Sequence, residues 1–441
     1  MRTCLRKIGI LAAAILLAAL CTIGCKTEVS DETFTVEVTA GEHGTVNANP
    51  ASGKVTQGTV ITFTALPETD YKVDTWTITG GSFEEGGTTG SPTADVTISA
   101  DTKVNVSFTP ATYAEVPFGA NGANLDNHLK NTQPDINGIY YIKVTGLTAA
   151  NLKGKSSYPY EPSALGKILN DNPTKKVVLK LGEISGLTDM SWCFYGCESL
   201  TQAPVIPSGV TNMNSCFYGC ESLTQAPVIP AGVTDMNSCF YSCGSLTQAP
   251  VIPNSVTDMN LCFYGCYSLT QAPVIPSGVT NMDSCFSRCE SLTQAPVIPA
   301  GVTNMFSCFS GCESLTQAPV IPASVTIMSY CFSGCESLTQ APVIPAGVAG
   351  MSSCFSGCES LTQAPVIPNS VIYMSYCFSG CKNITAVTLK CNYNVGKFDQ
   401  AFSGCKKLTA RSIKVPSSEL ERYKGTAPIM GTQRNRFIAD E

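Results

Sequence analysis

The stretch CFYGCESLTQAPVIPSGVTNMNS at residues 193–215 is followed at once by a near copy, and the copying continues along the chain. First cysteines recur every 23 residues from Cys193 to Cys377, and a second cysteine follows each of them by four residues. LTQAPVIP occurs eight times between residues 200 and 368. A fixed period in this range is typical of a solenoid, in which each repeat forms one coil and packs on its neighbours.

The apolar residues of one repeat predict which side chains face the interior of the coil. The spacing LxxAxV from Leu200 predicts a strand, and the apolar residues after it recur every three or four positions, as on one face of a short helical turn. Pro204 and its copies remove a backbone donor at the same level of every coil, so we expect a narrow sheet. The residues expected inside are Leu200, Ala203, Val205, Val210, Met213, Cys216, Phe217 and Cys220.

A strand near the end of the array indicates which positions face outward. In ITAVTLKC, residues 384–391, Lys390 occupies by linear count the position of Ile206. Lysine is almost never buried alone, so we expect Ile206 and its copies to point into solvent beside the glutamines. Exposed apolar rows mark contact surfaces. The candidate ligand-binding face therefore comprises Gln202, Ile206, Gln225, Ile229, Gln248, Ile252, Gln271, Ile275, Gln294, Ile298, Gln317, Ile321, Gln340, Ile344, Gln363 and Ile367.

The paired cysteines allow two interpretations. In an exported protein a regular, even set is consistent with disulfides. Alternatively, both cysteines of each pair are small buried apolar residues in stacked columns. Ala401 replaces the first cysteine of the last pair while Cys405 remains, which favours buried thiols. The C-x3-C spacing and the position of both histidines outside the array predict no metal site.

The run M-x-x-[C/A]-F-x-x-C-x-x-L with a proline-ended strand, over residues 187–415, resembles the BspA-like leucine-rich repeat surface proteins of bacteria, including spirochaetal lipoproteins. The resemblance implies an α+β repeat solenoid. It also implies a secreted or surface-anchored protein that adheres to ligands of a host or of neighbouring cells.

Ahead of the array, residues 33–110 alternate apolar and polar residues in short runs separated by glycine-rich turns, which predicts a small antiparallel β domain. GEHGTV and ADTKVNVSF are similar to parts of the divergent internalin-type B-repeat. We expect six segments: a signal peptide at 1–24, a linker at 25–32, the β domain at 33–110, an N-terminal cap or spacer at 111–186, the solenoid at 187–415 and a C-terminal cap at 416–441.

The first residues predict export. Three basic residues precede an apolar run from Ile8 to Gly24, and Cys25 follows a small residue, as in a bacterial lipobox. We expect Cys25 to be lipidated. The predicted location is the bacterial outer membrane, at the cell surface, with a lipid anchor as the contact with the membrane.

Charge and motifs narrow the function further. The chain has 33 acidic against 27 basic residues, whereas a nucleic-acid partner requires a basic face. The sequence contains no nucleophile elbow, phosphate loop or metalloprotease motif, so we predict neither an enzyme nor a cofactor. The main hypothesis is adhesion to a host or bacterial surface protein or glycan. The alternative is a structural envelope or spacer protein with no dedicated ligand.

Overall fold

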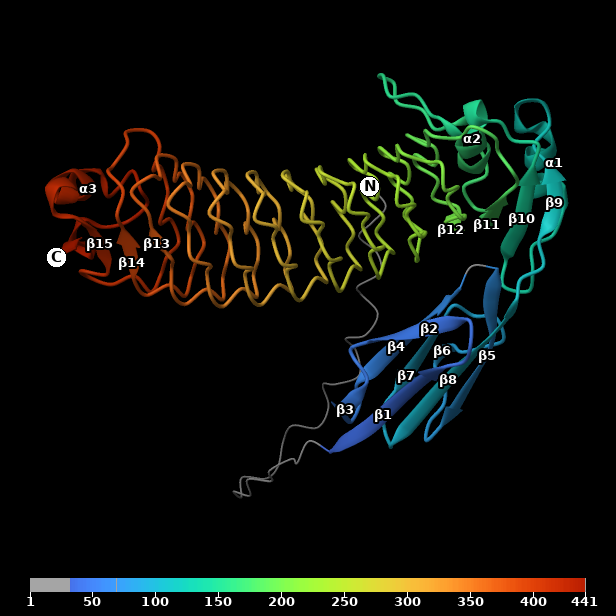
Figure 1. Cartoon of the computed structure of the whole chain (residues 1–441). Coiled ribbons are helices and arrows are strands. Elements are labelled where there is room, and N and C mark those ends of the chain that lie inside the picture. The colour runs from blue at the N-terminus through green and yellow to red at the C-terminus, as the bar shows by residue number, and fades with distance from the viewer. Residues whose placement is uncertain (1–31, 69, 441) are drawn as a thin grey trace, which may run out of the picture. The chain divides into compact units, whose positions relative to one another are not determined.

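The structure is a computed structural model and describes residues 32–68 and 70–440 (Figure 1). The chain divides into two compact units. One contains the described residues up to Ala65 together with Val73–Ser107, and the other contains Leu66–Lys72 and the chain from Phe108 onward.

The first unit is built from two four-stranded sheets in the orders β3-β1-β8-β5 and β2-β4-β7-β6. Pairing is mainly antiparallel, as the sequence predicts, but β1 and β8 pair in parallel. Alternate residues such as Ile61 and Phe63 of β4 are buried, so each sheet contributes one face to the core. The strands are β1 Thr33–Ala40, β2 Gly44–Asn49, β3 Gly53–Thr56, β4 Val60–Pro67, β5 Tyr71–Thr79, β6 Glu85–Gly86, β7 Thr93–Thr97 and β8 Thr102–Pro110.

The second unit begins with a less regular segment that ends in contact with the first coil. Its sheet has the order β12-β11-β10-β9 and is parallel throughout, so β11 covers the edge of β12, the first strand of the array. An open edge would otherwise leave backbone groups unpaired. The elements are β9 Ala114–Pro117, η1 Ala120–Gly122, α1 Ala123–Asn131, β10 Ile139–Thr145, η2 Ala149–Leu152, α2 Ala164–Asn170, β11 Lys176–Leu181 and β12 Leu200–Gln202.

At the other end the parallel sheet β13-β14-β15-β16 extends beyond the last coil, and α3 lies there as well (Figure 1). Tyr423 of α3 is fully buried, and its hydroxyl donates a hydrogen bond to the Cys391 carbonyl oxygen at 3.0 Å. The tail thus closes the apolar interior. The elements are β13 Val366–Ile367, β14 Val387–Leu389, β15 Ile413–Pro416, η3 Ser417–Glu419, α3 Leu420–Thr426, η4 Arg434–Arg436 and β16 Phe437–Asp440.

Between these ends the coils stack with little regular strand, as the prolines predict. From Gln202 to Gln363 the proline side is joined by single parallel bridges, one at each glutamine. In most coils the threonine before the glutamine adds a bond: Thr224 donates its amide to the Thr201 carbonyl oxygen at 3.1 Å, and its hydroxyl donates to the same atom at 3.2 Å. Side-chain donors therefore supplement a ladder that the prolines shorten.

The opposite side of each coil carries most of the hydrogen bonds between coils. There the amides of Met213, Ser215, Phe217 and Gly219 donate to carbonyl oxygens of the next coil, at 2.7–2.9 Å. Along this side of the coils, the described residues of the array form no helix. Successive turns, each closed by a hydrogen bond between residues three apart, replace the short helical turn that the sequence predicts. Backbone hydrogen bonds thus join the coils on both sides of the array.

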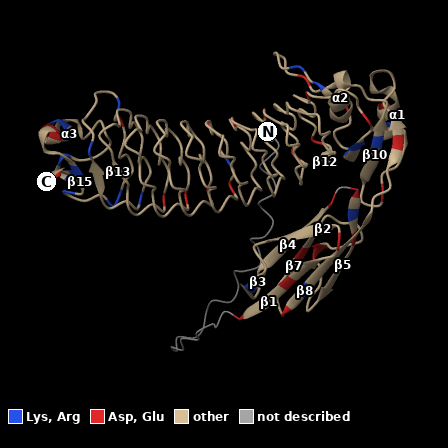
Figure 2. Cartoon of the chain, in the orientation of Figure 1, with Lys and Arg blue, Asp and Glu red and all other residues tan. Residues whose placement is uncertain are grey.

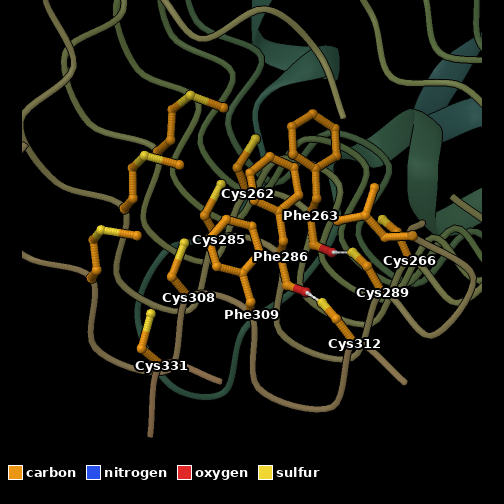
Figure 3. Close-up of a cluster of buried hydrophobic side chains, with 14 of the residues drawn as sticks. Cys262, Phe263, Cys266, Cys285, Phe286, Cys289, Cys308, Phe309, Cys312 and Cys331 are labelled. Atoms are coloured by element: carbon orange, nitrogen blue, oxygen red, sulfur yellow. Dashed lines mark hydrogen bonds between the residues drawn. The ribbon is translucent and has the colours of Figure 1, made fainter. Parts of the chain in front are cut away.

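The interior consists of columns of identical side chains. Phenylalanine rings stack from Phe194 to Phe402 with centroids 5.4–6.0 Å apart, and leucine, methionine and both cysteine columns are buried around them. All twenty cysteines of the described residues are free and buried, in agreement with the buried-thiol interpretation. In the second column each thiol from Cys220 onward donates to the phenylalanine carbonyl oxygen of the preceding coil, as Cys289 does to Phe263 and Cys312 to Phe286 (Figure 3).

Burial sets the chemistry of these thiols. Loss of solvation raises the pKa of Cys358 and of Cys405 to about 12, because a thiolate is poorly stabilised in an apolar interior. The columns are therefore neutral thiols at neutral pH, and they serve packing rather than nucleophilic chemistry.

The prediction for the isoleucines is wrong, because Ile206 and its copies are at most 7% exposed. The preceding valine, predicted to be inside, is the exposed residue in every copy. The buried isoleucines are Ile206, Ile229, Ile252, Ile275, Ile298, Ile321, Ile344 and Ile367.

A difference of one residue in strand length explains the error. Leu361 lies six positions before the inward Ile367, whereas Ile384 lies only five before Leu389, and the structure pairs Ile367 with Leu389. Lys390 therefore corresponds to the proline after Ile367 and not to the isoleucine. Strand side chains alternate between faces, so one extra residue exchanges inside and outside for all that follow. The same extra residue causes the register shift between β11 and β12. There Leu200 and Gln202, which are two residues apart, lie opposite the consecutive residues Val177 and Val178.

Candidate binding face

The exposed side chains on the proline side of the coils form a column of valines, which we call the valine face. Six of its eight members are 85–89% exposed, and the first and last are 56% exposed. Such exposure is unusual for an apolar side chain that is repeated so regularly. The valine face consists of Val205, Val228, Val251, Val274, Val297, Val320, Val343 and Val366.

Grooves lie between successive valines. One groove of about 400 Å³ is lined by Val297, Val320 and neighbouring prolines, and the next, of about 370 Å³, is lined by Val320 and Val343. Val320 thus forms the ridge that separates two grooves. A third groove of about 570 Å³ lies between the coils that carry Val228 and Val251. The face is therefore a series of parallel ridges and grooves with the period of the coils.

Two prolines hold each ridge. Pro319 precedes Val320 and Pro322 follows Ile321, and a proline ring fixes its own backbone φ angle and restricts the residue before it. Ile321 is buried against the core and fixes the other side of the segment. A side chain held in this way loses little conformational freedom when a partner binds, so the ridges are preorganised for contact.

The glutamines of the predicted face lie on the same side of the array. Gln202 and Gln225 are half-buried, and the six copies from Gln248 to Gln363 are exposed. Their backbones form the bridges between coils. The structure thus brings the glutamines to the valine face and removes the isoleucines from it.

The face carries no charge, because LTQAPVIP contains no ionisable side chain in any of its eight copies. Figure 2 shows few charged residues along the coils and more of them toward the ends of the array. The nearest acids are Glu198 and its copies, two positions before the leucine, and most of them are exposed. The valine face can therefore attract a partner only through apolar and polar contacts.

Tyrosines form a second ladder that sequence analysis did not identify. The rings of Tyr218, Tyr241 and Tyr264 stack with centroids 4.2 and 4.5 Å apart, and serines replace them from Ser287 onward. Their faces cover one another, so the ladder presents ring edges and hydroxyls. It is less suited than the valines to form an apolar contact.

The valine face could have been found from one signal in the sequence. In every copy of LTQAPVIP, the last inward residue is the isoleucine six positions after the leucine. In ITAVTLKC, which follows the LxxLxL spacing, Leu389 comes only five positions after Ile384. Counting inward positions back from the second proline, rather than forward from the leucine, places the valine outside.

Some predicted features fall outside what the structure describes or have no counterpart in it. Cys25, the predicted lipidation site, lies outside the described residues. Across residues 32–68 and 70–440, no helix is long and apolar enough to cross a membrane. In the same part of the chain, no three histidine, cysteine or acidic residues are grouped so that they could hold a metal ion.

Comparison with known families identifies both parts of the chain. The BspA type leucine rich repeat region matches residues 190–316 and 306–424, together more than half of the chain, in six copies. The chain belongs to the BspA-type leucine-rich repeat family. Residues 34–112 match the divergent InlB B-repeat domain, as the sequence predicts. BspA-type repeats generally serve in protein binding or adhesion and are typically non-catalytic scaffolds.

Solved structures with similarity to this chain include three bacterial leucine-rich repeat proteins. The protein from Treponema pallidum is 24% identical, with a TM-score of 0.34, over 43% of this chain and 88% of that one. A leucine rich cell surface protein from Faecalibacterium prausnitzii is 21% identical, with a TM-score of 0.33, over 55% and 80%. A protein from Bacteroides ovatus is 19% identical, with a TM-score of 0.33, over 60% and 84%. No curated protein matches the chain.

Proposed function

We propose that this protein is a non-catalytic cell-surface lipoprotein whose array binds another macromolecule through the valine face. The observation that carries the proposal is the column of exposed valines with grooves between them, held in place by prolines. Protein binding is the general role of the family. The valine face is the surface on which we place that role in this chain.

The chemistry of the face favours a protein over a glycan as the partner. Valine and proline side chains offer no hydrogen-bond donor or acceptor, whereas sugar hydroxyls require partners when they are desolvated. An apolar side chain of a protein can instead fill a groove and exclude water. Eight equivalent ridges also allow many weak contacts to act together.

The main experiment compares binding by the soluble chain from residue 26 onward with binding by two variants. Val320→Lys places a charge on a ridge. Ile327→Lys is the matched control, since this 43% exposed side chain lies in the same coil but outside the valine face. We expect adhesion to immobilised matrix proteins or to whole bacterial cells to fall at least about tenfold for Val320→Lys and to change little for the control.

Equal adhesion by the wild-type chain and both variants would overturn the role of the valine face. No adhesion by the wild-type chain to any cell or protein would favour the alternative, a spacer in the envelope. Binding to glycans that survives Val320→Lys would assign recognition to another surface.

The location at the outer membrane rests on the predicted signal and on Cys25. We expect an alkyne analogue of palmitate to label the wild-type chain in bacterial cells and Cys25→Ala to abolish the label. Protease added to intact cells should remove the array if the chain faces outward. Absence of label on the wild-type chain would contradict lipid anchoring.

A further inference from the structure

We propose that the partner of the valine face is the valine face of a second copy of this chain. This inference rests on the proposed function, because it names the partner of the same surface. The pitch of the face carries the argument. Ridges and grooves repeat once per coil, and a partner fills all of them only if its own contacts repeat at the same spacing.

A second copy meets that condition without adjustment. Its ridges have the same spacing because its coils are joined by the same backbone hydrogen bonds. Those bonds lie on both sides of the coil, at Thr224 and at Gly219, so the backbone fixes the spacing of the ridges equally in both copies. Val320 of one copy can then enter a groove such as the one between Val297 and Val320 of the other.

The apolar area that the column offers is of the size that a stable dimer buries. Each exposed valine contributes on the order of 100 Å² of apolar surface, so the column contributes about 800 Å² per copy. Stable protein interfaces bury about 800 Å² on each partner. The eight copies of LTQAPVIP carry no charge, so contact desolvates no ionised group of the face.

The glutamate column indicates how the two copies lie. Glu290 and Glu313 each come two residues before the leucine of their coil and border the side of the face where the strand begins. If the two arrays ran in opposite directions with strands parallel, these columns would face each other and repel. With array axes parallel, strands run antiparallel and each column faces the other edge, at residues such as Ala300. We therefore infer a parallel dimer, which two chains anchored in one membrane could form.

Sedimentation equilibrium of the soluble chain from residue 26 tests the dimer. We expect a dimer at micromolar concentration, and Val297→Lys with Val320→Lys should raise the dissociation constant by about 100-fold or more. Thr303→Lys with Thr326→Lys is the matched control, because these exposed positions lie in the same region and carry Ala349 and Ile372 in later copies. Circular dichroism establishes that each variant is folded.

Three results would overturn the inference: a monomeric wild-type chain at 100-fold higher concentration, a valine variant that dimerises as before, or equal weakening by the control. A monomeric wild-type chain whose adhesion is still lost on Val320→Lys would remove self-association and leave the proposed function standing. A dimer disrupted by the valine variant, without adhesion to anything else, would support the inference and remove adhesion to a foreign ligand.

A short bismaleimide crosslinker tests the orientation. Val228→Cys alone should crosslink in a parallel dimer, because position 228 of one copy enters a groove beside position 228 of the other. In an antiparallel dimer, crosslinking would require a mixture of Val228→Cys and Val343→Cys chains. Crosslinking of the mixture alone would contradict the parallel arrangement.

Discussion

The thiol of Cys312 donates a hydrogen bond to the main-chain carbonyl oxygen of Phe286, 3.1 Å away on the preceding coil. The first cysteine of the same repeat, Cys308, belongs to the column in which Ala401 is tolerated. The two columns are therefore different, although both are buried: the second contributes a bond between coils in addition to packing.

We expect Cys312→Ala to destabilise the array more than Cys308→Ala does. Both changes leave a small cavity, but only the first removes a hydrogen bond, so the costs should be about 2 and about 1 kcal/mol. Urea unfolding followed by circular dichroism measures both. An equal or reversed order would contradict the role assigned to the second column.

The buried thiols should make stability depend on pH in alkaline solution. Burial raises the pKa of Cys358 and of Cys405 to about 12, whereas an unfolded thiol ionises near pH 8.5. The unfolded state therefore holds fewer protons than the folded state above about pH 8.5, and stability falls as pH rises toward 12. We expect the urea midpoint to be constant from pH 6 to 8 and to drop steeply from pH 9 to 11. A midpoint that does not change over the alkaline range would contradict neutral buried thiols.

Backbone conformation predicts a stabilising substitution. Each coil has a left-handed residue just before its second cysteine; it is glycine in most coils but Ser242 in one and Arg288 in another, with φ at 54° and 60°. Such a φ costs a non-glycine residue about 1 kcal/mol or more. Arg288→Gly should therefore raise stability by about that amount. Gly334→Ala should lower it by a similar amount, since the added Cβ would meet only ordinary contacts at 3.6 Å. Unfolding midpoints that move in the opposite directions would show that these positions are not strained.

Neighbouring residues of one ridge should respond very differently to truncation. Ile298→Ala removes a buried side chain and should cost about 2–4 kcal/mol, whereas Val297→Ala removes an exposed one and should cost less than about 0.5 kcal/mol. Urea unfolding of the two single variants provides the comparison. Similar losses would mean that Val297 also packs in the core.

Much of this fold follows from the sequence. The period of 23 residues predicts the coil, and Leu200, Met213 and Phe217 are inside as their spacing indicates. The small β domain and the strands β10 and β11 follow from alternation. The conformation of the turns could not be predicted from the sequence. Ser215 has a left-handed backbone, but the equivalent residue in other coils is, for example, Leu261 or Tyr330, and it is never the glycine that would indicate a left-handed conformation.

The candidate face was predicted on the right side of the coil and with the wrong residue. Strand alternation fixes only relative orientation, so an argument from Lys390 transfers to Ile206 only if both strands have the same length. They differ by one residue, and a single sequence offers no alignment that reveals it. The pairing of Ile367 with Leu389 supplies that information.

Thiol labelling gives the most direct test of the valine face. Native cysteines of the described residues are all buried, so an introduced cysteine on the surface should react alone. We predict that Val297→Cys reacts with maleimide within minutes in the folded protein, at a concentration too low for self-association, and that Ile298→Cys reacts only after unfolding. Rapid labelling of Ile298→Cys with protection of Val297→Cys would contradict the register on which the face depends.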